Sequence, residues 1–154
     1  MKLIYLSSSE NKTRNLAKKL IGLNKNQLSK KCLIFALEGD LGTGKTIFAK
    51  GVAEALGIKK VIRSPSFIIQ REFPYTLNDA SGKFFHIDLW RMESEREVEK
   101  LKIEELIIPG NVILIEWAEK MGKLTKNIFD FKKVLIIRLK ITFFTENQRK
   151  IEIL

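Results

Sequence analysis

Short apolar runs bounded by turn residues predict the strands of a central sheet. They cover residues 2–6, 33–38, 68–73, 84–88 and 112–116. The run 33–38 is apolar at successive positions, which is typical of a strand covered on both faces. Polar residues at 76–82 predict a turn between two of these strands.

The segments between the predicted strands have apolar residues at helical spacing, which predicts helices there. Ser7 and Glu10 have the spacing of a capping box and begin a predicted helix. The expected buried face of this helix consists of Leu16, Leu20 and Leu23. A second helix is predicted over residues 45–56, with Gly57 as the residue that ends it. A third, acidic helix is predicted over residues 93–106.

Alternating residues at 134–143 and 150–154 predict a C-terminal antiparallel hairpin, with Phe143 and Phe144 in its core. Strands separated by helices and followed by a hairpin predict an α/β fold. Its central sheet is expected to be mostly parallel, flanked by helices, with the antiparallel hairpin at an edge. The length of 154 residues predicts a single domain over residues 1–154.

Composition adds a basic charge and argues against a membrane protein. The net charge of +10 fits an acidic partner such as nucleic acid. It also fits the bias toward Lys, Ile and Asn that an AT-rich genome imposes. The longest apolar run, residues 32–37, is far shorter than the ~20 residues that span a bilayer. With a lone cysteine, Cys32, and no signal-like N-terminus, the expected location is the cytoplasm.

Residues 39–46 fit the P-loop pattern G-x-x-x-x-G-K-[ST] in full, between a predicted strand and a predicted helix. Glycines let the chain curve closely around a phosphate, and N–H groups at a helix start bind an anion. The predicted nucleotide-binding residues are Leu41, Gly42, Thr43, Gly44, Lys45 and Thr46. We expect the Lys45 ammonium to reach the β- and γ-phosphates and the Thr46 hydroxyl to bind Mg²⁺.

Two carboxylates end predicted strands. Glu116 follows the apolar run 112–115, the usual setting of a Walker B acid, and Asp88 follows the run 84–87. Because the carboxyl ends of parallel strands meet at one edge of a sheet, both are expected beside the P-loop. Either can hold Mg²⁺, directly or through water, and Asp88 can instead orient an attacking water. The alternative is that each caps the element that follows it.

Three further residues have both a functional and an ordinary interpretation. Ser66 belongs to the polar segment Ser-Pro-Ser-Phe at 64–67, in which a hydroxyl suits a place near a γ-phosphate or the chain forms an ordinary Ser-Pro turn. His86 shares a strand face with Asp88, because side chains alternate along a strand, and is either catalytic or a packing or hydrogen-bonding residue. Trp117 stacks on a base or a partner, or it is a half-buried aromatic anchor.

Four motifs in this order resemble the TsaE family, also named YjeE, of small bacterial P-loop ATPases. They are the P-loop, Ser-Pro-Ser-Phe at 64–67, His-Ile-Asp-Leu-Trp-Arg at 86–91 and Ile-Glu-Trp-Ala-Glu at 115–119. The resemblance covers about residues 7–154. The chain has Ile47, Ser66 and Trp90 where the family usually has Thr, Thr and Tyr. None of these differences removes a charge that the chemistry needs.

The resemblance implies a function in tRNA modification. TsaE proteins assist the TsaD–TsaB complex in forming N6-threonylcarbamoyladenosine next to the anticodon of tRNAs that read codons starting with A. The resemblance implies ATP and Mg²⁺ as cofactors, TsaD and TsaB as partners, and an indirect link to tRNA through them. It assigns Mg²⁺ binding to Thr46 and Glu116. The implied catalytic residues are Lys45, Ser66 (at the switch position), Asp88 and Glu116.

Two other classes of function stay open. A small-molecule kinase shares the P-loop, although the sequence shows no arginine-rich lid segment. A nucleotide-gated nucleic-acid-binding module is supported by the +10 charge alone. A GTPase is disfavoured because the base-reading signature Asn-Lys-x-Asp does not occur.

Overall fold

The computed structural model describes residues 2–129 and 132–154. Within them lies a seven-stranded sheet of order β1-β7-β6-β2-β5-β4-β3. The strands are β1 (Leu3–Ser7), β2 (Cys32–Glu38), β3 (Gln70–Leu77), β4 (Ala80–Asp88), β5 (Val112–Glu116), β6 (Val134–Thr145) and β7 (Gln148–Ile153). The pairs β6–β2, β2–β5 and β5–β4 are parallel, and the outer pairs are antiparallel. The predicted fold class is therefore confirmed, with β1 added outside the C-terminal hairpin β6–β7.

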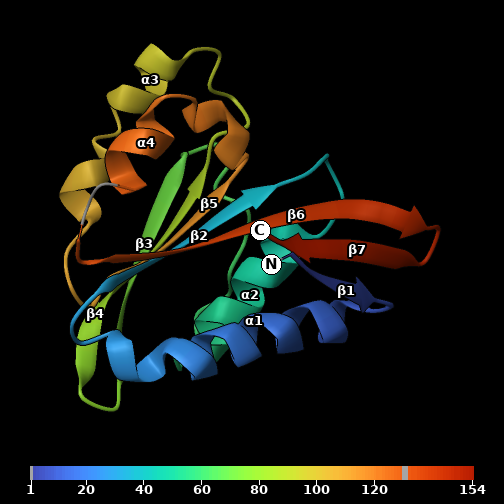
Figure 1. Ribbon diagram of the computed structural model, residues 1–154, viewed down its shortest axis with the longest axis horizontal. Helices are drawn as coiled ribbons and strands as arrows, with labels where there is room; N and C mark the ends of the chain where they lie inside the picture. Colours follow the sequence, from blue (N-terminus) through green and yellow to red (C-terminus); the bar gives the residue numbers. More distant parts are fainter. Residues whose placement is uncertain (1, 130–131) are drawn as a thin grey trace.

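Helices cover both faces of this sheet (Figure 1). The α-helices are α1 (Glu10–Asn24), α2 (Lys45–Ala55), α3 (Glu95–Glu99) and α4 (Leu124–Phe129). Short 3₁₀ helices are η1 (Lys25–Gln27), η2 (Ile103–Leu106) and η3 (Ala118–Met121). Helices α1 and α2 pack on one face, and α3, η2 and η3 pack on the other. No described helix is long and apolar enough to cross a membrane.

Strand β2 is buried on both sides, which explains its continuous apolar sequence. Leu33, Phe35 and Leu37 belong to the core beneath α1 and α2. Cys32, Ile34 and Ala36 alternate with them and belong to the core on the opposite face. Burial raises the pKa of the Cys32 thiol to about 12, so the reactive thiolate is scarce at neutral pH.

Helix α1 begins at a different serine from the one that the sequence predicted. The Ser9 hydroxyl, not that of Ser7, accepts the capping hydrogen bond, from the Lys12 N–H at 3.2 Å. Ser7 is the buried last residue of β1, and its hydroxyl lies 2.8 Å from the Thr13 hydroxyl. The capping-box prediction was wrong because pairing with β7 keeps Ser7 in the sheet.

The predicted buried face of α1 is confirmed for Leu16 and Leu20 and wrong for Leu23, which is 70% exposed. The actual face is completed by Ala17 and Ile21, which are fully buried. Because a helix turns once every 3.6 residues, a face centred between Ala17 and Leu20 leaves Leu23 at its rim.

The β3–β4 hairpin is longer than predicted. The expected polar turn over 76–82 shrinks to Asn78 and Asp79, because Leu77 pairs with Ala80 and the strands continue to the turn. The strand predicted to begin at residue 68 instead begins at Gln70.

The predicted acidic helix over 93–106 is broken into two short pieces, α3 and η2. The Ser94 hydroxyl caps α3, accepting a hydrogen bond from the Glu97 N–H at 3.3 Å. Lys102 then adopts a positive φ of 49°, which a continuous α-helix does not allow. Tertiary packing of Val98 and Ile103, both buried, overrides the helical spacing here.

Phe143 and Phe144 were expected in the core of the C-terminal hairpin, and this was wrong. They are 53% and 54% exposed, while Ile141 and Ile151 are fully buried. A register shift between Phe143 and Thr145 disrupts the regular alternation of side chains at the tip of the hairpin. The Phe143 ring instead lies 4.4 Å from the guanidinium carbon of Arg149.

Replacing Leu20 by Ala tests the packing of α1. The change is expected to lower the free energy of unfolding by about 2–5 kcal/mol, because it leaves a cavity in the core. The matched change Leu23→Ala, on the same helix, is expected to alter it by under about 0.5 kcal/mol. Urea unfolding followed by circular dichroism measures both. Equal effects of the two changes would contradict the observed helix face.

Candidate functional site

The loop between β2 and α2 has the backbone geometry of an anion-binding site. Gly39, Gly42 and Gly44 have φ angles of 146°, 77° and 105°, which favour glycine. Helix α2 begins at Lys45, and no described side chain caps its start. The first N–H groups of a helix have no partner within it, so those of α2 are available to an anion.

Gly39 also lies against the neighbouring strand β6. A Cβ atom at this position would lie 2.2 Å from the Ile141 carbonyl oxygen, far inside van der Waals contact. The close approach of the loop to β6 therefore requires glycine. It fixes the start of the loop against the sheet.

The Lys45 side chain folds back over the loop. Its Nζ donates to the carbonyl oxygens of Gly39 and Asp40, at 2.6 and 2.7 Å, and lies 4.3 Å from the centroid of the Trp117 ring. Burial lowers the pKa of this ammonium. The carboxylates that oppose this shift are those of Glu116, Glu119, Asp88 and Asp40. The cation is thus held within reach of an anion placed in the loop.

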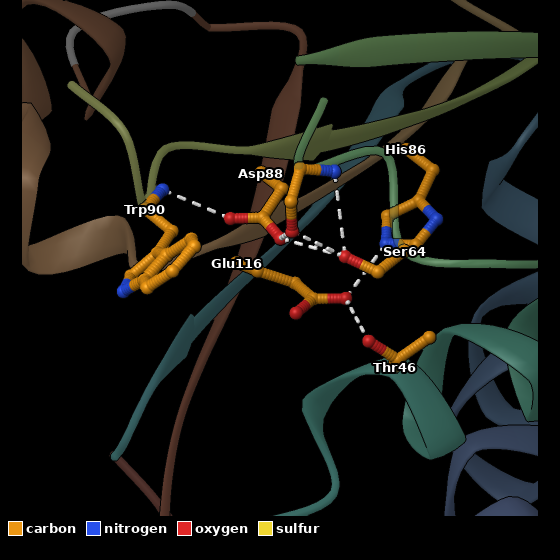
Figure 2. A network of polar contacts seen from close by, with 7 residues as sticks. Thr46, Ser64, His86, Asp88, Trp90 and Glu116 are labelled. Carbon is orange, nitrogen blue, oxygen red and sulfur yellow. Dashed lines mark hydrogen bonds and ion pairs between the residues drawn. The ribbon is translucent and has the colours of Figure 1, made fainter. Parts of the chain in front are cut away.

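Glu116 connects the end of β5 to the P-loop helix. Its Oε1 accepts a hydrogen bond of 2.9 Å from the Thr46 hydroxyl, and His86 Nε2 lies 2.7 Å from the same oxygen (Figure 2). The Glu116 side chain is almost fully buried. A hydroxyl and a carboxylate oxygen so close together are the kind of donors that Mg²⁺ prefers.

Asp88 organises the segment that follows α2. Its Oδ2 accepts hydrogen bonds from the hydroxyls of Ser64, at 3.0 Å, and Ser66, at 2.7 Å. Its Oδ1 accepts the Trp90 N–H at 2.9 Å (Figure 2). Asp88 and Glu116 pair across β4 and β5, so their side chains lie at the same edge of the sheet. Through Asp88, Ser64 and Ser66 are held in the same cleft as the P-loop residues.

These groups line one cleft of about 280 Å³. The predicted site residues that line it are Leu41, Gly42, Gly44, Lys45, Thr46, Ser66, Asp88 and Glu116. Thr43 does not line this cleft. Its buried hydroxyl donates to the Asp40 carbonyl oxygen at 2.8 Å and supports the loop from within. The structure brings the predicted residues together, and their individual roles stay predictions.

A second cavity, of about 260 Å³, adjoins the first. Gly42, Gly44 and Ile47 line both. Its other walls include Thr13 from α1 and Arg149 from β7. The two cavities together offer room on either side of the loop for a ligand larger than a phosphate group.

Sequence reasoning missed several contacts of this site. It considered the segment 64–67 for the lining of the site but did not foresee the hydrogen bond from Ser64 to Asp88, and it did not find the second cavity, whose walls come from both ends of the chain. It left His86 and Trp117 open, although Trp117 directly follows Glu116 and was therefore a visible candidate. Trp117 is half-buried and packs against the core, as the anchor interpretation predicted, and its ring also contacts Lys45.

Residues 7–151 match the family model described as "Threonylcarbamoyl adenosine biosynthesis protein TsaE". The chain belongs to the TsaE family. An Aquifex aeolicus protein named "tRNA threonylcarbamoyladenosine biosynthesis protein TsaE" is 33% identical over 155 residues, which cover 99% of this chain and 96% of that protein. The resemblance inferred from the motifs is thereby confirmed.

Shorter matches agree with this assignment. A Bacillus subtilis protein with the same name is 45% identical over 85 residues, or 55% of this chain. This TsaE-family chain spans 50% of the length of that relative and 56% of a Haemophilus influenzae relative. Among solved structures, Bacillus subtilis YdiB superposes with a TM-score of 0.67 and 26% identity, covering 99% of this chain and 84% of YdiB.

Substitution of Gly39 by Ala tests the contact between the P-loop and β6. We expect a loss of more than about 1 kcal/mol of stability, because the new Cβ meets the Ile141 carbonyl and φ is positive. In the control Gly22→Ala, nothing lies near the new Cβ. This change is expected to raise the stability of the protein by about 0.5–1 kcal/mol, because Ala favours a helix more than Gly does. Thermal unfolding of both variants measures the difference. Effects of the same sign would show that the loop tolerates a side chain at Gly39.

Proposed function

We propose that this TsaE-family chain binds and hydrolyses Mg²⁺-ATP in the cleft beside the P-loop. The observation that carries the proposal is the 2.9 Å contact between the Thr46 hydroxyl and the Glu116 carboxylate, at the uncapped start of α2. A P-loop, a hydroxyl and a strand-end carboxylate in this arrangement suit a nucleotide phosphate chain with its metal ion.

Each residue of the cleft then has a chemical role. The N–H groups from Gly42 to Thr46 bind phosphate oxygens, and the Lys45 ammonium leaves the Gly39 and Asp40 carbonyls to meet the β- and γ-phosphates. Thr46 and Glu116 would hold Mg²⁺, which supplies positive charge to the phosphates.

Asp88 and the two serines lie on the other side of the cleft from the loop. The Asp88 carboxylate is an acceptor that can orient a water molecule for attack on the γ-phosphate. In the present state its Oδ2 is engaged by the hydroxyls of Ser64 and Ser66. A γ-phosphate beside Ser66 would compete for that hydroxyl, and this competition gives the segment its role as a switch.

The second cavity provides a place for the nucleoside. It adjoins the loop at Gly42, Gly44 and Ile47, where the phosphate chain would leave the cleft. Arg149 lies on its wall together with Glu10 and Glu146, and its guanidinium would leave the carbonyl oxygens of Glu146 and Gln148 to contact the phosphate nearest the ribose. This placement keeps the reacting end of the nucleotide beside Asp88 and Glu116.

We further propose that ATP hydrolysis serves tRNA threonylcarbamoyladenosine formation, with TsaD and TsaB as partners and tRNA reached through them. The family description and the names of the relatives support this pathway. Work on tRNA would place the protein in the cytoplasm. The alternatives of a small-molecule kinase and a nucleic-acid-binding module gain no specific support from the cleft.

Nucleotide binding is tested with Lys45→Ala. Removal of a buried cation that pairs with phosphate is expected to cost at least about 2 kcal/mol, or roughly 30-fold in the dissociation constant for Mg²⁺-ATP. The control Lys50→Ala removes a lysine from the same helix outside the cleft and is expected to leave binding unchanged. Isothermal titration calorimetry measures both. Unchanged affinity in Lys45→Ala would refute the assigned site.

The biological role is tested in multiple-turnover threonylcarbamoylation of tRNA with the TsaD–TsaB pair, ATP and Mg²⁺. Wild type is expected to support many turnovers, whereas Lys45→Ala and Glu116→Ala stall, because each lacks a group that the hydrolysis of ATP requires. ATP hydrolysis by the chain alone is expected to be weak. A reaction that proceeds equally with and without the chain would refute the role and leave only the nucleotide site.

A further inference from the structure

His86 is the only histidine of the chain and is fully buried on β4. Its Nε2 lies 2.7 Å from Glu116 Oε1 (Figure 2). A carboxylate that binds a metal ion is ionised and can only accept hydrogen bonds, so in that role of Glu116 the 2.7 Å contact requires a proton on Nε2. The ring is thereby fixed as a donor to Glu116.

The other ring nitrogen, Nδ1, makes no hydrogen bond of this kind to the part of the chain that the structure describes. His86 Nδ1 is buried without a hydrogen-bond partner among the described residues. The ring lies nearly parallel to Phe84, with 6.3 Å between the centroids, and Phe84 stacks in turn on Phe73. A buried polar atom without a partner lowers stability, so an apolar side chain would pack here at less cost. What the imidazole supplies, and an apolar side chain does not, is the N–H on Glu116.

Glu116 is held from two elements through one of its oxygens. The Thr46 hydroxyl on α2 and His86 Nε2 on β4 both bond Oε1. No described group bonds Oε2, and this oxygen points away from both donors (Figure 2). Because Glu116 lines the cleft, fixing Oε1 also fixes the direction in which Oε2 is presented.

We propose that His86 is a positioning residue, which holds Glu116 Oε1 so that the carboxylate is oriented for the metal ion of a bound nucleotide. The inference rests on the proposed function and names a residue that acts through Glu116 without touching the ligand. Partners that orient metal-binding carboxylates typically contribute 10–100-fold to metal affinity or activity. The role concerns Mg²⁺, while the P-loop N–H groups and Lys45 bind phosphate independently of it.

The experiment compares His86→Gln with His86→Asn. Both replace the ring by a buried amide, but only Gln places an N–H near the position of Nε2, whereas Asn places its amide near that of Nδ1. Calorimetry gives the ATP dissociation constant of each protein with Mg²⁺ and with a chelator. The measured quantity is the factor by which Mg²⁺ tightens ATP binding. We expect this factor to be about 10–100-fold smaller in His86→Asn than in wild type and nearly unchanged in His86→Gln. Affinity in the chelator is expected to be unchanged in both.

Other results would overturn the proposal. If ATP affinity falls in the presence of the chelator, or if both variants lose the Mg²⁺ enhancement equally, His86 only supports the fold. Thermal unfolding of each variant identifies this case. Full Mg²⁺ enhancement in His86→Asn would show that Glu116 needs no such donor. The single imidazole also gives an unambiguous ¹H–¹⁵N signal, in which an Nε2 without a proton would contradict the proposed hydrogen bond to Glu116. If wild type itself bound no ATP, the proposed function would fail instead.

Discussion

Parallel pairing of β2, β4 and β5 is the constraint on which the rest of the molecule depends. It ends the three strands at one edge of the sheet and aligns Asp88 with Glu116. The P-loop leaves the end of β2 at this same edge, so the uncapped start of α2 and two carboxylates converge there. Without this register, the same residues would be dispersed along the surface.

Convergence of charges has an energetic consequence. Lys45, Asp88 and Glu116 are all nearly buried, and a buried charge is tolerated only when it is paired or hydrogen-bonded. Here the loop carbonyls satisfy the ammonium, and hydroxyl groups satisfy both carboxylates. The polar groups of the cleft are therefore held in place by neighbouring protein groups.

The site also joins parts of the chain that are distant in sequence. The P-loop contacts β6 through the close approach at Gly39, while the second cavity brings α1 and the C-terminal hairpin to the other side of the loop. The antiparallel strands β1 and β7 at this end of the sheet thus contribute Ser7 and Arg149 to the walls of the second cavity. They provide the walls against which the nucleoside of the proposed ligand would lie.

Local sequence determined the strand β2, the glycine-rich loop and the start of α2, because a continuous apolar run and the P-loop pattern depend on neighbouring residues only. It also determined the family, since the motifs are short and contiguous. Local sequence was misleading for Ser7, for residues 93–106 and for Phe143, where sheet pairing, packing of buried side chains and a register shift override local preference. The contacts His86–Glu116, Lys45–Trp117 and Ser66–Asp88 follow from the alignment of strands and the path of a loop. Only the tertiary structure decided these contacts, because a distance between residues far apart in sequence is set by how the whole chain packs.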